Sequence, residues 1–225
     1  MQDHTLIVED VLLLMLDDTT GAPAGAGTLH HTLAGAVLAE LALIGRIRLD
    51  EDRAWYQGAQ VVATGAGPLP DPLLQTTYDA IAARPQDIHT LLATIGFELS
   101  EPVTERLVRR GLLRRERKRF LGLFPVTSLP ATGTGHESEL REQMSGVLED
   151  GGHPDARLAA VIAVISASGT VVLLHPVPRW SDTVATRAKE LEQGNWVAVA
   201  LNIAVTQTTT SSSAAVATVI NTAHS

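Results

Sequence analysis

A run of cationic residues directly precedes the most apolar turn of the chain, in the stretch RRERKRFLGLFPVTSLP at 114–130. An apolar tip with a cationic rim suits a membrane surface. The tip enters the boundary between headgroups and acyl chains, and each nearby cation contributes about 1 kcal/mol against anionic lipid. We therefore expect the tip to insert and the rim to bind headgroups. The tip consists of Phe120, Leu121, Leu123 and Phe124, and the rim of Arg114, Arg115, Arg117, Lys118 and Arg119.

The same stretch allows two other interpretations. The hairpin could pack on its own core or on a second copy, with the arginines solvated, since a charge run is usually a solvated face. A helix ending in LVRRGLL before a basic strand also suits a winged helix-turn-helix on DNA. That helix offers Arg106, Arg109 and Arg110, which we expect to extend the cationic face, but no Asn, Gln or Ser for base edges. The acidic remainder of the chain would repel DNA, so DNA binding is the weakest interpretation.

Few other residues have the types and spacing of a catalytic site. The adjacent carboxylates Glu9 and Asp10 could suggest acid–base chemistry, but no base or nucleophile accompanies them, so we expect an exposed stripe on an amphipathic helix. His30 and His31 are neighbours in sequence, so on a helix they face different directions and form a poor metal pair. No P-loop, nucleophile elbow or dinucleotide fingerprint is present. We expect a protein that is not an enzyme and uses no cofactor or metal.

Charge is unevenly distributed along the 225 residues. The net charge is −8, yet the segment from Glu101 to Arg119 has eight basic and three acidic residues. One cationic face on an acidic protein is not the pattern of a general polyanion binder. The apolar content of 45% is that of a globular protein, and no Cys is present. Polar residues interrupt the two long uncharged stretches at 158–174 and 193–225, so we expect neither to span a membrane.

Hydrophobic periodicity and turn residues predict a mainly α-helical chain with a few short strands. Gly45 and Gly111 are each placed to end a helix before a strand. The stretch at 118–128 should form a hairpin, with Gly122 able to adopt the positive φ of a tight turn. Helices are expected near 6–17, 32–45, 72–84, 87–99, 102–110, 137–149, 155–167, 181–193 and 195–205, and strands near 46–52 and 59–65.

Four segments resemble the Golgi phosphoprotein 3 family in order and spacing: LIVEDVLLLMLDDTTG, LAGAVLAELALIGRIRL, LVRRGLL and FLGLFPVTSLP. The similarity runs from about Leu6 to about Ala200, the block AVLAELALIGRI at 36–47 is most specific, and the Ala-rich style is similar to bacterial members. The resemblance implies one mostly helical domain with a central bundle, surrounding amphipathic helices and a protruding hydrophobic β-hairpin. Eukaryotic members bind phosphatidylinositol 4-phosphate as peripheral membrane adaptors for glycosyltransferase tails. In the family the hairpin serves membrane contact and oligomerisation.

The chain departs from the family at its phosphoinositide pocket. The resemblance implies a Trp and three Arg there, but an ungapped alignment places Gly25, Ala34, Phe97 and Ser100 at these positions. A specific phosphatidylinositol 4-phosphate site therefore does not carry over. The apolar tip and the basic rim remain, and they suit anionic lipid in general.

These observations predict a helical domain at 1–205 and a Ser/Thr-rich tail at 206–225 that is helical in part. The expected protein is cytoplasmic and peripherally bound to the inner face of a membrane. There it binds anionic lipid or phosphoinositide headgroups as an adaptor. Expected partners are anionic lipids, cytosolic tails of membrane proteins and further copies of the chain through the hairpin; nucleic acid is not expected. The alternative is a scaffolding protein whose hairpin mediates oligomerisation.

Overall fold

The protein is mainly α-helical, as the sequence predicts. The computed structural model describes residues 4–17, 21–50, 60–120, 124–128, 132, 135–174 and 176–222. For 117–120, 124–128 and 210–222 this description covers the backbone alone. The helices in the described part are α1 (Ile7–Met15), α2 (Leu29–Leu43), α3 (Pro72–Ala83), α4 (Ile88–Gly96), α5 (Ser100–Arg109), α6 (Gly135–Leu148), α7 (Ala156–Ala167), α8 (Asp182–Gln193) and α9 (Trp196–Thr222), with a short 3₁₀ helix η2 (Val171–Leu173).

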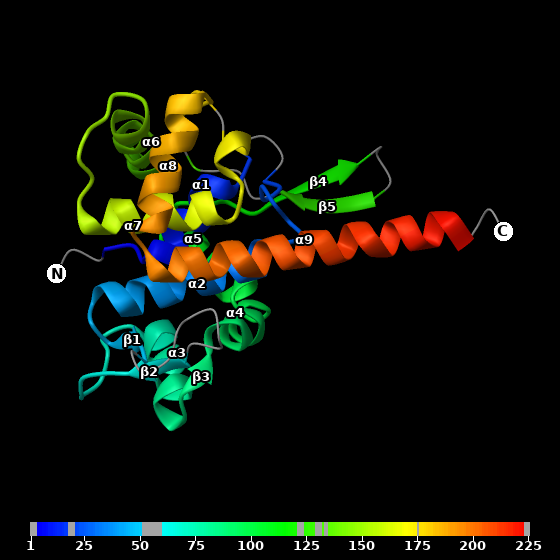
Figure 1. Ribbon diagram of the computed structural model, residues 1–225. Helices are drawn as coiled ribbons and strands as arrows, with labels where there is room; N and C mark the ends of the chain where they lie inside the picture. Colours follow the sequence, from blue (N-terminus) through cyan, green and yellow to red (C-terminus); the bar gives the residue numbers. More distant parts are fainter. Residues whose placement is uncertain are drawn as a thin grey trace.

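Helix α2 lies at the centre of the fold. Residues 31–41 are all buried, so this part of α2 has no solvated face. In Figure 1, α9 crosses the molecule alongside α2, with α3, α4 and the small sheet on one side and α1 and α5–α8 on the other. Gly35 permits this close approach, because a Cβ added there would lie 2.9 Å from Leu201 Cδ2 of α9. The apolar faces of α1, α7 and α9 complete one continuous core.

Two helices end in the same way, and both are followed by a strand. Gly45 ends α2 with φ +69° and Gly111 follows α5 with φ +72°. Arg46 N donates to Leu41 O at 2.8 Å and Leu112 N donates to Leu107 O at 2.9 Å, the long hydrogen bond of a Schellman motif. Both predicted helix ends are confirmed. The second one directs the chain from α5 into the hairpin.

The strands form two separate antiparallel sheets. The strands β1 (Ile47–Leu49), β2 (Gln60–Ala63) and β3 (Gln86–Asp87) pair in the order β1-β2-β3. The strands β4 (Glu116–Phe120) and β5 (Phe124–Ser128) form the predicted hairpin, in which Phe120 pairs with Phe124. Its turn, with Gly122, lies outside the described residues. Figure 1 shows the hairpin and the C-terminal part of α9 extending from the body in the same direction.

Helix α9 continues well beyond the last helix expected from the sequence. It runs without a break from Trp196 to Thr222, so the segment at 206–222 is helical. The chain has no Asp, Glu, Lys or Arg from Gln193 to its end, which includes all of α9. Within the described residues, no helix has both the length and the apolar character required to cross a bilayer.

Candidate anion-binding site at the base of the hairpin

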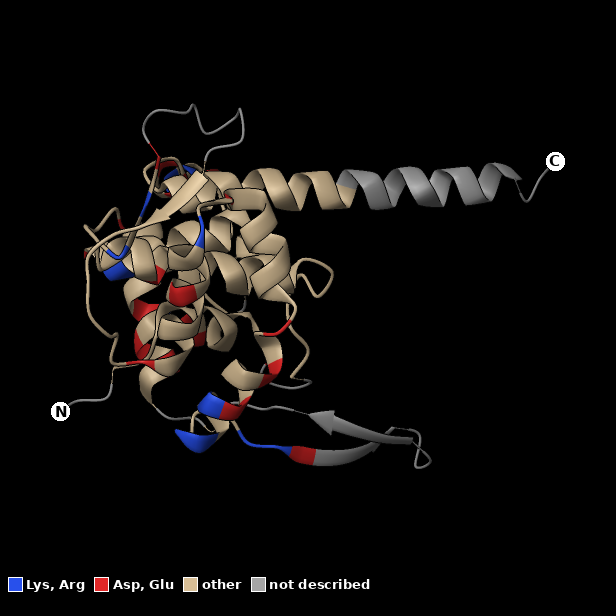
Figure 2. Cartoon of the chain, turned by 90° about the horizontal axis from the view of Figure 1, so that it is seen from below, with Lys and Arg blue, Asp and Glu red and all other residues tan. Residues whose placement is uncertain are grey.

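Three arginines of α5 lie together where this helix approaches the hairpin. Their spacing places Arg106, Arg109 and Arg110 on one face of the helix. Together with Asp71, which precedes α3, they line an open cavity of about 350 Å³. Figure 2 shows basic residues gathered where α5 leads into the hairpin, with acidic residues among them. The structure therefore brings together the three residues predicted to extend the cationic face, which we call the α5 arginine cluster.

Two members of the α5 arginine cluster are anchored to the body of the protein. Glu9 Oε1 accepts from Arg110 Nε at 2.8 Å and from Arg106 Nε at 3.3 Å, while Arg106 Nη2 lies 2.7 Å from Asp71 Oδ2. The side chains of Arg106 and Arg110 are only 15% and 19% exposed. The other oxygen of Glu9 accepts from Leu6 N at 2.7 Å, so the same carboxylate also caps α1.

Electrostatics keep Arg106 charged in this position. Burial by itself lowers the pKa of Arg106, because it disfavours the charged guanidinium. The hydrogen bonds to Asp71 and Glu9, together with their negative charges, outweigh burial and raise the pKa above its ordinary value. Arg106 is therefore a permanent cation in the wall of the cavity.

Arg109 differs from its two neighbours. It is exposed, and it has no carboxylate partner within the described part of the chain. By contrast, Arg106 and Arg110 already pair with Glu9, and Arg106 also pairs with Asp71. An incoming anion can therefore bind Arg109 without displacing an existing ion pair.

The rim arginines that the structure describes fold back onto nearby acids. Arg115 Nη2 lies 2.6 Å from one carboxylate oxygen of Glu101 and 2.6 Å from one of Glu105. The hydrogen bond to Glu101 raises the pKa of Arg115. Arg114 pairs with Glu116. Water screens exposed ion pairs of this kind, so a headgroup phosphate can compete for both arginines.

The rest of the predicted membrane contact falls outside the described side chains. This applies to both the apolar tip and the cationic part of β4. The residues are Phe120, Leu121, Leu123 and Phe124 at the tip, and Arg117, Lys118 and Arg119 in the strand.

The positions that align with the family's phosphoinositide pocket have no cationic side chain. Ala34 is fully buried in α2 and Ser100 begins α5. Phe97 is 72% exposed, and its ring stacks on His30 with 4.4 Å between centroids. Burial lowers the pKa of His30, so this imidazole is neutral at physiological pH. The fourth position, Gly25, has a positive φ and contributes only backbone.

The expected exposed stripe on α1 is wrong. Glu9 is fully buried and Asp10 is 1% exposed. Asp10 Oδ2 lies 2.7 Å from Arg157 Nη2 of α7, and its other oxygen lies 2.8 Å from His136 Nε2 of α6. Buried carboxylates require such partners. These partners are more than 90 residues away in sequence, so no local sequence pattern predicts the contacts.

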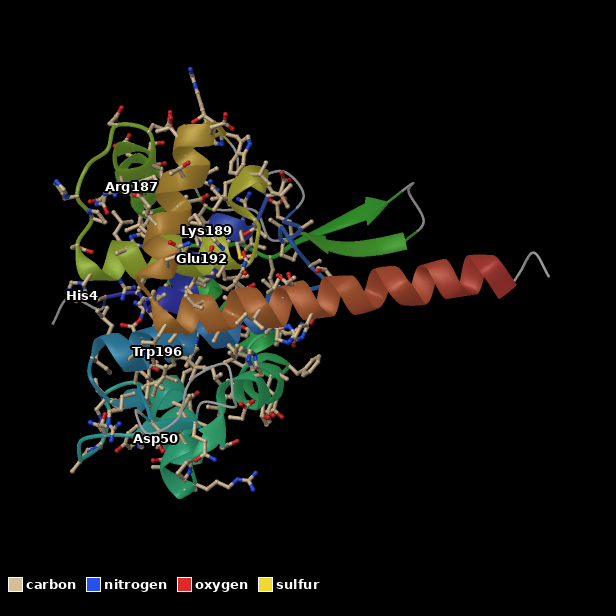
Figure 3. The ribbon with its side chains drawn as sticks, viewed as in Figure 1. His4, Asp50, Arg187, Lys189, Glu192 and Trp196 are labelled. Carbon is tan, nitrogen blue, oxygen red and sulfur yellow. The ribbon has the colours of Figure 1, made fainter. Side chains whose placement is uncertain are left out.

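Another buried carboxylate, that of Glu192, joins α7 and α8. Figure 3 shows Lys189 and Glu192 on α8, and their side chains form an ion pair. Glu192 is 3% exposed, and its Oε2 accepts from Ser166 Oγ at 2.9 Å. Because both oxygens of Glu192 are already engaged, this cluster holds α8 against α7 and offers no general base.

The comparison with known families decides the assignment. The family model described as Golgi phosphoprotein 3 (GPP34) matches residues 7–208. The chain belongs to the Golgi phosphoprotein 3 family. This family is known for lipid-binding adaptor roles and is not an enzyme family. The resemblance noted from four sequence segments is therefore confirmed. A search of curated proteins found no significant match to the chain.

Proposed function

We propose that this Golgi phosphoprotein 3 family member is a cytoplasmic adaptor that docks on anionic membranes. The hairpin tip inserts among lipid headgroups, and the α5 arginine cluster with the rim arginines holds the headgroups. Membrane docking then leaves the helical body available to bind the cytosolic tails of membrane proteins.

The observation that supports this proposal is the position of the cationic cavity. Its lining includes Arg109, which is exposed and has no carboxylate partner among the described residues. Only six residues separate Arg109 from Glu116, where β4 begins. In Figure 1 the hairpin that follows extends from the body in the same direction as the end of α9, so it can reach a surface beyond the body.

The proposed recognition is electrostatic rather than specific for one headgroup. The exposed guanidinium of Arg109 attracts any phosphate or carboxylate headgroup. The aligned phosphoinositide positions carry Ala34, Phe97 and Ser100, which supply no cation. We therefore expect vesicles of equal surface charge to bind equally, whether the charge comes from phosphatidylserine or phosphatidylinositol 4-phosphate.

Oligomerisation through the hairpin is the second candidate function. A two-stranded hairpin is at best marginally stable alone in water, so β4 and β5 are expected to gain a covering surface. That surface is a membrane in the first proposal and a second copy of the chain in the alternative. Light scattering separates them: the alternative requires a mass that rises with protein concentration in the absence of lipid.

The test is binding to phosphatidylcholine vesicles with and without charge-matched anionic lipid. We expect binding to the anionic vesicles alone, weakening as salt is added. Arg109→Gln should weaken this binding about fivefold, since one cation near the surface contributes about 1 kcal/mol. The control is Arg84→Gln, an exposed arginine at the other end of α3 from Asp71, about 20 Å away along the helix. Equal binding to neutral vesicles would contradict the proposal.

A further inference from the structure

Helix α9 continues past the helical body of the protein as a projecting segment. Its first turns are buried, and Val205 is its last buried residue among those whose side chains are described. The helix then runs on to Thr222, so the segment 206–222, which we call the α9 extension, is about 25 Å long. Figure 1 shows this end of α9 projecting from the body. The family match ends at residue 208, so most of the α9 extension lies outside the matched region.

The face of α9 that packs on α2 continues into the α9 extension. In the body this face carries Leu201, which lies so close to α2 that a Cβ added at Gly35 would be 2.9 Å from Leu201 Cδ2. Ser212, Ala215 and Val219 follow 11, 14 and 18 residues later, which is close to three, four and five turns of an α-helix. The helical register therefore places these three positions on the Leu201 face, beyond the buried part of α9.

The composition of the α9 extension does not by itself favour a helix in water. Residues 206–213 are all Thr or Ser apart from Gln207, and these two residue types propagate a helix less well than Ala does. The buried turns of α9 supply the helix nucleus, but most helical stability in proteins comes from packing of one face rather than from propensity. We therefore expect the α9 extension to pack against a further surface.

The charge of α9 decides which surface fits. The helix contains no Asp, Glu, Lys or Arg. Helices that lie on a membrane surface carry Lys and Arg on their polar face, so α9 lacks the residues for that role. A charged protein surface would lose hydration against α9 without gaining an ion pair. An identical α9 extension brings no charge, and small residue types at the contact allow two helices to approach closely. The surface that fits is a second copy of the chain.

We propose that the α9 extension pairs with the α9 extension of a second copy through the Leu201 face. Such a contact is isologous, because the same positions meet on both copies across a two-fold axis. Ala215 lies next to the middle of the α9 extension, so the pairing brings this position close to its counterpart. The contact uses no residue of the hairpin, and it does not depend on membrane docking.

The first experiment is light scattering of the full chain in the absence of lipid. One helix against one helix is a small interface, so we expect the mass to rise from one copy to two across about 1–100 μM protein. Ala215→Glu puts a charge from each copy into the contact and should keep the protein monomeric over this range. The matched control is Ala217→Glu, which makes the same change about half a turn away from the Leu201 face and should dimerise as the parent does. The hairpin variant Leu123→Asp should also dimerise as the parent does.

The second experiment introduces single cysteines, which is clean because the chain contains no Cys. Ala215→Cys should form a disulfide-linked dimer under mild oxidation, since a disulfide requires two Cα atoms within about 4.4–6.8 Å. Ala217→Cys, on the opposite face, should remain largely unlinked. A mass that stays at one copy, or equal linking of the two cysteine variants, would overturn the proposal. A dimer that Leu123→Asp abolishes and Ala215→Glu preserves would overturn it as well, and would assign the dimer contact to the hairpin.

Discussion

Arg110 Nε donates to Glu9 Oε1 across 2.8 Å, and this contact joins the candidate anion site to the buried first helix. The same oxygen lies 3.3 Å from Arg106 Nε, so a single buried carboxylate orients two of the three arginines that line the cavity. The end of α5 that carries these arginines is thus part of the structural core of the protein. Loss of Glu9 should therefore affect stability before it affects binding.

Replacing Glu9 with Gln should destabilise the protein strongly. The change leaves Arg106 and Arg110 without their shared buried carboxylate, and breaking a buried ion pair costs about 3–5 kcal/mol. Urea unfolding measures the difference. Glu142→Gln removes the same charge from an exposed position on α6 and should change stability by less than about 0.5 kcal/mol. Similar losses in the two variants would show that Glu9 is not a structural partner of the arginines.

Replacing Asp71 with Asn should strengthen binding to anionic vesicles. The change makes the cavity lining one charge more positive, while Asn still accepts from Leu73 N and caps α3. The added attraction of about 1 kcal/mol predicts roughly fivefold tighter binding in co-sedimentation. Asp79→Asn makes the same change of charge on an exposed position of α3 that does not line the cavity. If both variants gained equally, net charge rather than the cavity would explain binding.

Two glycines in helices should respond in opposite directions to Ala. A Cβ at Gly96 would lie 2.1 Å from His30 O, so Gly96→Ala must separate α4 from α2 and should cost about 1–3 kcal/mol. A Cβ at Gly146 meets nothing within 4 Å, so Gly146→Ala in α6 should stabilise by about 0.5–1 kcal/mol through helix propensity. Thermal unfolding of both variants checks the signs, and a stable Gly96→Ala protein would refute the close packing of these helices.

The two histidines of α2 should make stability depend on pH. Burial lowers the pKa of His30 and His31 below the ordinary value of 6.5, and the charge of His30 lowers that of His31 further. The unfolded chain then binds protons more readily, so stability is highest above pH 6.5 and declines as pH falls toward the folded-state pKa. Urea unfolding between neutral and mildly acidic pH should show a shallower decline for His30→Gln/His31→Gln than for the parent. Parallel declines would contradict this assignment.

Much of the fold follows from local sequence signals. Gly45 and Gly111 end their helices with positive φ, and Gly122 between two short extended runs is enough to predict the β4–β5 hairpin. The length of α9 was not predicted, because Ser and Thr side chains are weak local signals for a helix. Whether such a segment is helical depends on the helix that precedes it. Here the first turns of α9 are anchored by the buried Val197 and Leu201.

The candidate site was only partly predictable. The helical spacing of Arg106, Arg109 and Arg110 was sufficient to place them on one face. Their partners were not predictable, because Glu9 and Asp71 are distant in sequence and meet the arginines only through packing. The periodicity of a sequence does not encode which distant residues form ion pairs.

The central claim is that the hairpin docks the protein on anionic membranes, and flotation with vesicles tests it most directly. The variant is Leu123→Asp at the predicted tip, where a charge should cost roughly 2–4 kcal/mol of insertion. The control is Leu173→Asp, which changes an exposed leucine on η2. We predict that the parent and the control float with anionic vesicles and that Leu123→Asp does not. Flotation of Leu123→Asp equal to that of the parent, or no flotation of the parent, would contradict the account.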